Sequence, residues 1–142
     1  MAQNFENHTR VVPAFHFGVV GILVINLLWN VWRIIHSVSV ESVISLLLAL
    51  AFLVGLLYAR MFALTVQDRV IRLEMRLRLQ QLLQADLRAR ISEFTVGQLI
   101  ALRFASDAEL PDLARRVLTE KLTDRKAIKK LIRNWEPDYQ RA

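Results

Sequence analysis

Two asparagines, Asn26 and Asn30, are the polar side chains best placed to do chemistry, because both lie inside a long apolar stretch. Residues four positions apart share one face of a helix, and uncharged amides in an apolar medium require hydrogen-bond partners. The pair predicts either a polar pathway or an interhelical hydrogen-bonding site that packs helices together. Arg33 continues this face one turn later, near enough to the end of the stretch for its guanidinium to reach water.

Among the three histidines, His16 in the sequence AFHFG has the position that best suits a cofactor. It lies at the edge of the first apolar stretch and could be an axial ligand to a haem or chlorin within a larger complex. The chain offers it no second ligand at a suitable spacing, and the alternative is an interfacial aromatic cluster with Phe15 and Phe17.

Other signatures of catalysis are missing from the sequence. There is no cysteine, and the spacing of the histidines fits no zinc site. No phosphate-binding loop, metalloprotease motif or nucleophile elbow occurs. We therefore expect no enzyme activity, no cofactor and no metal site.

Small residues recur every four positions on both apolar stretches, at Ala14 and Gly18 on the first and at Ala51, Gly55 and Ala59 on the second. Small side chains let helix backbones approach closely in lipid. We expect the longer stripe to pack the second helix against the first, with self-association of the protein as the alternative.

Arginines gather where the second apolar stretch ends, and we expect them at the lipid head-group interface. They are Arg60, Arg69, Arg72, Arg76 and Arg78. Arg60 interrupts the apolar run close to its end, where snorkelling reduces the cost of a charge in the bilayer. This bias of positive charge towards the two chain ends predicts that both termini are cytoplasmic.

The elements that position these side chains follow from the separation of apolar and charged residues. The chain of 142 residues is 54% hydrophobic and 23% charged, yet residues 11–32 and 42–59 contain no charged residue. Each stretch approaches the roughly 20 residues of a membrane-spanning helix. A soluble protein that buries both helices is the alternative, but the remaining chain is too short to surround them.

The sequence predicts an all-α membrane protein with a two-helix transmembrane hairpin. Its parts are a polar arm (1–12), a first transmembrane helix (13–36), a tight extracytoplasmic turn (37–41), a second transmembrane helix (42–66), a cytoplasmic continuation of that helix (67–83) and a cytoplasmic module of short helices (84–142). The turn is short enough to require antiparallel helices. High helix propensity over residues 67–83 indicates that the second helix continues beyond the bilayer.

Two apolar stripes at helical spacing follow this continuation. The first contains Val66, Val70, Leu73 and Leu77, and the second contains Ile71, Met75, Leu79 and Leu82. In the module, Thr95 with Gln98 predicts a capping box, and Pro111 predicts the first turn of a helix that ends near Leu122. Thr123 is expected to cap the last helix.

Several segments together resemble an uncharacterised family of small bacterial two-span membrane proteins. They are QNFENHTR (3–10), FHF (15–17), LTVQDRVIRLEMRLRL (64–79), ADLRARI (85–91), QLIALRFASDAELP (98–111) and KAIKKLIRNWEPDY (126–139). The resemblance covers almost the whole chain and implies membership over its full length and a bacterial origin. It implies no activity, ligand or catalytic residue.

These observations favour a non-enzymatic protein of the bacterial inner membrane that anchors a cytoplasmic interaction module. It would act as a scaffold or as an accessory subunit of a membrane complex, with another membrane protein or a second copy of itself as partner. Residues 67–142 hold 16 Lys and Arg against 11 Asp and Glu, which is a moderate positive bias. A membrane-anchored nucleic-acid binder is one alternative, although no nucleic-acid motif is present. An oligomeric pore around Asn26 and Asn30 is the other.

Overall fold

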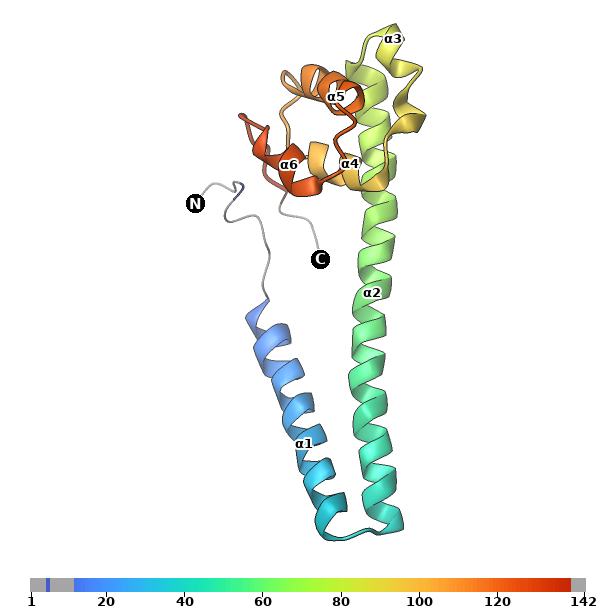
Figure 1. Ribbon diagram of the computed structural model, residues 1–142, viewed down its shortest axis with the longest axis vertical. Coiled ribbons are helices and arrows are strands. Elements are labelled where there is room, and N and C mark those ends of the chain that lie inside the picture. The colour runs from blue at the N-terminus through green and yellow to red at the C-terminus, as the bar shows by residue number, and fades with distance from the viewer. Residues whose placement is uncertain (1–4, 6–11, 139–142) are drawn as a thin grey trace. The chain divides into compact units, whose positions relative to one another are not determined.

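A computed structural model describes residue 5 and residues 12–138. Every regular element of this described part is a helix, so the predicted all-α class is confirmed. The chain forms two compact units, of which the first covers residues 10–63 and the second comprises residues 1–9 and 64–142. Helix α2 (Val40–Leu82) contributes residues to both units and is helical without interruption (Figure 1).

The first helix of the chain begins with a π-helical segment, η1 (Ala14–Val19), and continues as α1 (Val20–His36). At its start, the carbonyl of Val12 accepts hydrogen bonds from the backbone N–H groups of Phe15 and His16, at 3.1 and 2.9 Å. Pro13 is tolerated here because its missing N–H would have no acceptor in a first turn. Apolar spacing alone does not separate π from α hydrogen bonding over so few residues.

Helix α2 begins at Val40, two residues before the position expected from the sequence. Ser39 and Ser42 explain the earlier start, since each satisfies the backbone of the other. The N–H of Ser42 donates to Oγ of Ser39 at 3.1 Å, and the N–H of Ser39 donates to Oγ of Ser42 at 2.9 Å. This reciprocal arrangement occupies free donors of the first turn, as a capping box does, and leaves only residues 37–39 between the two helices.

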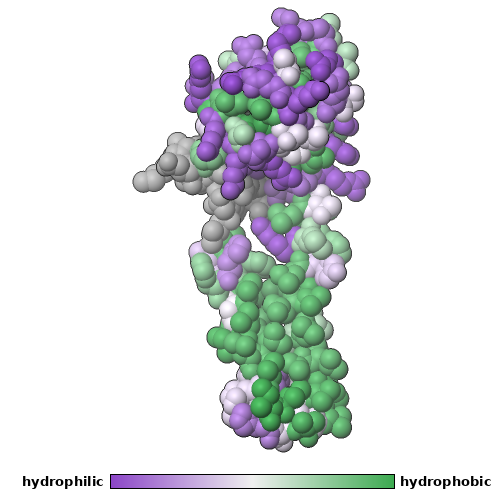
Figure 2. All heavy atoms as spheres, viewed as in Figure 1, coloured by the Kyte–Doolittle hydropathy of each residue, from purple (hydrophilic) through white to green (hydrophobic). Residues whose placement is uncertain are grey.

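The apolar side chains of the first unit lie mainly on its surface. Figure 2 shows hydrophobic residues covering this unit, and the exposed side chains include Phe17, Ile22, Ile25 and Phe52. The segments Ala14–His36 and Val40–Leu82 are both long and apolar enough to cross a membrane. Such surfaces are unfavourable in water because exposed apolar area costs about 25 cal/mol per Å².

The second unit packs short helices against the last turns of α2. The helices are α3 (Ala85–Arg88), the 3₁₀ helix η2 (Ile91–Glu93), α4 (Val96–Leu102), α5 (Leu110–Thr119) and α6 (Arg125–Lys130). Its largest fully buried side chains are Leu79, Leu83, Leu99, Leu102, Phe104, Leu110, Val117 and Ile128. Each such side chain contributes about 1.5–3 kcal/mol through burial, so the unit has a real hydrophobic core.

The helix ends of this module agree with the sequence in one place and differ in two. Thr95 and Gln98 form the predicted capping box. Helix α6 is capped by Asp124, whose carboxylate accepts the N–H groups of Lys126 and Ala127, so the expected cap at Thr123 is wrong.

Helix α5 ends at Thr119 and does not reach Leu122. Lys121 adopts a left-handed conformation with φ of 51°. The N–H of Leu122 then donates to the carbonyl of Val117 at 3.0 Å. This is the hydrogen bond of a Schellman motif, which ends a helix by turning the chain away from its axis.

Candidate functional site

The arginine-rich part of α2 presents two different surfaces within the second unit. Of its two apolar stripes, the one with Ile71, Met75 and Leu79 is buried in the module core, where Leu82 also packs. The other stripe, which we name the α2 seam, consists of Val66, Val70, Leu73 and Leu77, with exposed fractions of 59, 48, 62 and 52%. The module therefore uses one face of α2 and leaves the seam uncovered.

Arginines border the α2 seam on the same helix. Arg69 and Arg72 are exposed and Arg76 is half-buried. Together with seam residues they line a shallow groove of about 420 Å³. The side chains are long enough to cover apolar surface with their methylene stems while the guanidinium stays in water. An apolar stripe edged by positive charge is suited to contact another surface.

Arg78 has a different environment from the other arginines. Its Nη2 donates to the carbonyl of Ala105 at 2.7 Å and to the carboxylate of Glu136 at 2.9 Å, and its Nε donates to Asp107 at 2.7 Å. Its Nη1 donates to the carbonyl of Arg103 at 3.2 Å. The sequence placed Arg78 among residues that meet lipid head groups, whereas here its guanidinium joins α2 to two distant parts of the module.

Two exposed ion pairs lie on the module surface, of which one links α3 to α5 and the other is local. Arg115 pairs with Asp86 at 3.0 Å, and Arg90 pairs with Glu93 at 2.8 Å. A hydrogen bond from the backbone N–H of Leu87, followed by the contact with Arg115, lowers the pKa of Asp86. The side-chain hydrogen bond from Arg90 lowers the pKa of Glu93. These groups are exposed and act as structural contacts of the surface.

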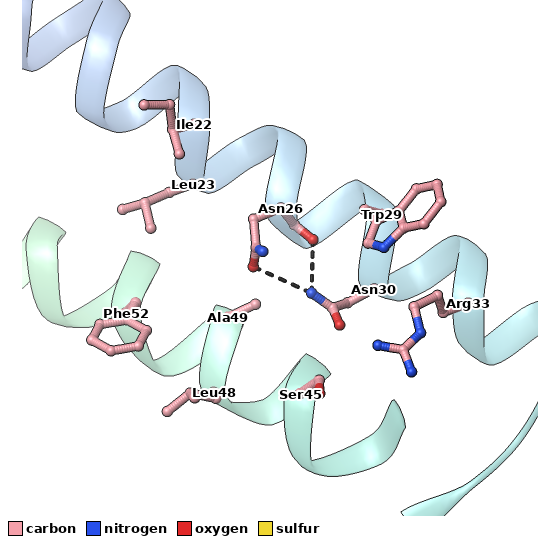
Figure 3. A pocket seen from close by; sticks show the side chains of 10 residues that line it. All are labelled: Ile22, Leu23, Asn26, Trp29, Asn30, Arg33, Ser45, Leu48, Ala49 and Phe52. Carbon is pink, nitrogen blue, oxygen red and sulfur yellow. Dashed lines mark hydrogen bonds between the residues drawn. The ribbon is translucent and has the colours of Figure 1, made fainter. Parts of the chain in front are cut away.

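A polar groove of about 520 Å³ lies between α1 and the start of α2 in the first unit (Figure 3). Its polar lining residues are Asn26, Asn30, Arg33 and Ser45, and the rest of the lining is apolar, with Trp29 at its rim. Helix spacing explains the row of side chains from α1, since positions 26, 30 and 33 follow one face. The structure thus brings the predicted polar residues together in one groove.

The hydrogen bonds of the two asparagines run along α1. Nδ2 of Asn30 donates to the backbone carbonyl of Asn26 at 2.9 Å and to its Oδ1 at 3.2 Å (Figure 3). Asn30 is buried and Asn26 is exposed. Arg33 forms an ion pair of 3.5 Å with Glu41 beyond the connection. Asn30 thus donates to Asn26 within one helix, which suits a packing role.

The small-residue stripe of α2 lies on the surface of the first unit. Ala51, Gly55 and Ala59 are all exposed, and a Cβ added at Gly55 would meet no atom within 4 Å. The same holds for Gly18 of the shorter stripe, and Ala14 is exposed. Within this unit the longer stripe therefore does not mediate close approach of α1.

His16 lies in η1 and is engaged by its own backbone. Its Nδ1 is 2.9 Å from the carbonyl oxygen of Val12, and its ring contacts Phe15 edge-on at 5.2 Å between centroids. His8 falls outside the described residues. No group of three or more His, Cys, Asp or Glu side chains that could hold a metal ion occurs among the residues that the structure describes.

Arg60, which the sequence places at the lipid head-group interface, is half-buried in α2.

Sequence spacing did not identify which surfaces of α2 would be occupied. Both stripes have equivalent periodicity, and the burial of one depends on side chains that are distant in the chain. The acceptors of Arg78, at residues 103–107 and 136, carry no local signal that links them to it. The cap at Asp124 could have been recognised, since Asp is as good an N-cap as Thr.

Comparison with known proteins identifies a family and no characterised relative. A family model described as "Family of unknown function (DUF6526)" matches residues 1–142. No curated protein and no solved structure matches the chain.

Proposed function

Since the chain belongs to this family of unknown function, we propose its role from its own residues: it is a non-enzymatic membrane protein that anchors a helical interaction module. The two apolar helices hold the protein in the bilayer, and the module binds a protein partner on the cytoplasmic side. The protein acts as a scaffold or as an accessory subunit of a membrane complex, in the bacterial inner membrane.

Anchoring is supported by the exposure of the first unit. Phe17, Ile25 and Ile35 are about 70% exposed, at 74, 69 and 74%. In a lipid environment this apolar surface no longer contacts water, so the free-energy cost of exposing it disappears. Positive charge lies near the ends of the two spans that are closest to the chain termini, which supports an orientation with both termini in the cytoplasm. After alkaline washing of native membranes the protein is expected in the membrane pellet, and release into the supernatant would contradict the proposal.

The observation that carries the interaction role is the exposed α2 seam. Val66, Val70, Leu73 and Leu77 line one face of a helix whose opposite face is already buried in the module core. Isolated apolar residues are ordinary on a surface, but a row at helical spacing bordered by arginines is typical of a helix that docks against a partner. The module core contains none of the four seam residues.

The test uses full-length protein in its native membrane with a photo-crosslinking residue at Leu73 or, as the control, at the exposed position Arg72. Adducts with protein are expected from Leu73 in large excess over Arg72, because only Leu73 lies on the seam. If neither position yields a protein adduct, the interaction role is wrong. The identity of the adduct is a separate question.

A transport role is the second candidate, favoured by the polar groove of Asn26, Asn30, Arg33 and Ser45. Several copies around these residues could enclose a polar pathway. Purified protein in liposomes would then conduct ions or small solutes, and Asn26→Leu would abolish the flux. The scaffold role predicts no flux above that of empty liposomes for either protein.

A further inference from the structure

The spacing of the α2 seam is that of a coiled coil. Its residues, Val66, Val70, Leu73 and Leu77, are separated by four, three and four positions. This alternation repeats every seven residues, so that Val66 and Leu73 occupy d positions and Val70 and Leu77 occupy a positions. We propose that the seam is the contact surface of a parallel two-stranded coiled coil formed by α2 helices of two copies of this protein. The proposal rests on the interaction role proposed above and names its partner.

The exposure of the seam leaves room for this partner. The four side chains are 48–62% exposed, although Ile71, Met75 and Leu79 of the other stripe are buried. Arg69, Arg72 and Arg76 alternate with them along the chain. Because of these arginines, residues 66–77 are poorly suited to full immersion in hydrocarbon. In water, the exposed apolar row is stabilised when it packs against a second apolar row.

The central pair of the seam favours two strands, whereas the outer pair, Leu77 at a and Val66 at d, has the reverse arrangement. Val70 is β-branched at an a position, and Leu73 occupies the following d position. In parallel coiled coils, β-branched residues at a with Leu at d favour dimers over trimers and tetramers. No charged residue occupies any of the four seam positions.

Charges beside the seam are complementary between two copies. In this register Arg69 is a g residue and Glu74 is the e residue five positions later. A g residue of one strand lies opposite that e residue of the other strand in a parallel pair, so Arg69 meets Glu74 of the second copy twice by symmetry. In an antiparallel pair g faces g, which would bring the positive charges of Arg69 and Arg76 together. The charge pattern therefore selects a second copy in parallel orientation.

Membrane anchoring provides the same orientation. Copies inserted with one topology are related by a twofold axis along the membrane normal, which makes their α2 helices parallel. Four seam residues form a short coiled coil, and confinement to the bilayer raises the effective concentration of the second copy. The association is therefore expected of the full-length protein in a membrane.

Cysteine crosslinking tests the contact, and it is simple here because the chain has no cysteine. Single variants Val70→Cys and Leu73→Cys are oxidised in native membranes. Arg72→Cys is the control: it is exposed and borders the seam, but in this register it occupies a c position, which does not face the second strand. Disulfide-linked dimers are expected to form about tenfold faster or more at positions 70 and 73 than at 72, since seam positions directly oppose each other. Equal rates at all three positions would overturn the coiled coil.

Charge variants test the orientation. In the cysteine variant Leu73→Cys, Arg69→Glu and Glu74→Arg are each expected to reduce crosslinking several-fold, because each places like charges across both symmetric pairs. The double variant Arg69→Glu/Glu74→Arg should restore it. In an antiparallel pair, Arg69→Glu would relieve repulsion between g residues and increase crosslinking. Increased crosslinking in that variant would therefore overturn the parallel arrangement.

The photo-crosslinking adduct at Leu73 separates the two proposals. An adduct at twice the mass of the chain, reduced by Arg69→Glu, supports the second copy as the partner. An adduct with a different protein and none with itself overturns this inference and leaves the interaction role intact. The absence of any protein adduct overturns both.

Discussion

Nη2 of Arg78 lies 2.9 Å from Oε2 of Glu136, so α2 is joined to a residue 58 positions later in the chain. The same guanidinium also reaches Asp107 and the carbonyls of Arg103 and Ala105. Four of the five N–H donors of the Arg78 side chain are thereby used to connect one helix to two loops. Both the Arg78 side chain and apolar packing therefore hold the module against α2.

A tryptophan reporter makes the module accessible to measurement in the full-length protein. Trp135 packs on Phe104 with ring centroids 4.9 Å apart. The other tryptophans, Trp29 and Trp32, lie in α1 and can be replaced by phenylalanine. Fluorescence of Trp135 in detergent then reports unfolding of the module alone.

Replacing Arg78 by alanine is expected to destabilise the module by about 2–3 kcal/mol, because it removes charge-assisted hydrogen bonds and leaves two backbone carbonyls without their donor. Urea unfolding followed by Trp135 measures the change. Arg72→Ala is the matched control on the same helix and should alter the free energy of unfolding by no more than about 0.5 kcal/mol. Equal effects of the two variants would show that the Arg78 contacts do not stabilise the module.

Leu79 and Leu77 lie two residues apart on α2, with exposed fractions of 0 and 52%. Leu79→Ala is expected to cost about 2–5 kcal/mol through lost burial and the cavity that remains. Leu77→Ala should change the unfolding free energy of the monomer in detergent by about 0.5 kcal/mol or less. The same variant should weaken self-association in the membrane, because Leu77 belongs to the α2 seam. A reversed order of the two stability effects would contradict the assignment of the faces.

Gln98 should be more important for stability than its capping partner Thr95. Thr95→Ala removes an N-cap and is expected to cost about 1 kcal/mol. Gln98→Ala also leaves the carbonyl of Leu122 without the donor now 2.8 Å away, and Gln98 is buried, so a loss of about 2–3 kcal/mol is expected. Trp135 fluorescence in urea would reveal the order, and a larger effect of Thr95→Ala would show that the Leu122 contact is dispensable.

Lys121→Gly is expected to stabilise the module by about 0.5–1 kcal/mol, because a left-handed residue with a Cβ is strained and glycine is not. The φ angle of Lys121 is 51°, at the end of α5. Lys121→Ala keeps the Cβ and should leave the urea midpoint nearly unchanged. A fall in the midpoint for the glycine variant would mean that the lysine side chain contributes more than its backbone strain costs.

Acid should weaken the module through Asp86 and Glu93. The pKa of each carboxyl is lowered in the folded state from ordinary values of 3.8 and 4.5. The unfolded chain therefore binds protons first as the pH falls, so the stabilisation is complete above the unfolded pKa values and disappears as pH passes below the folded ones. The urea midpoint is expected to fall between about pH 5 and pH 3, as these carboxyls take up protons. The double variant Asp86→Asn/Glu93→Gln should reduce that fall, and an identical pH profile would exclude a contribution from this pair.

The sequence features that predicted helices depend on residues close together in the chain, so those predictions agree with the structure. Charge-free stretches of about 20 residues already predict long apolar helices, because a helix that crosses the bilayer needs about that many apolar residues. The Thr95–Gln98 capping box depends on side chains three positions apart, and it forms as expected. The end of α5 differed because one lysine adopts a conformation that its type does not favour.

Periodicity determined that residues 66–82 form an amphipathic helix with two apolar stripes, but only tertiary packing decided which stripe is buried. Ile71 and Leu79 enter a core made by residues of α4, α5 and α6, whereas Val70 remains exposed on the other side. In the same way, sequence alone assigned Arg78 a positive charge, and tertiary structure supplied its acceptors. Helical spacing is a property of neighbouring residues, while burial and ion pairing depend on atoms that folding brings from far along the chain.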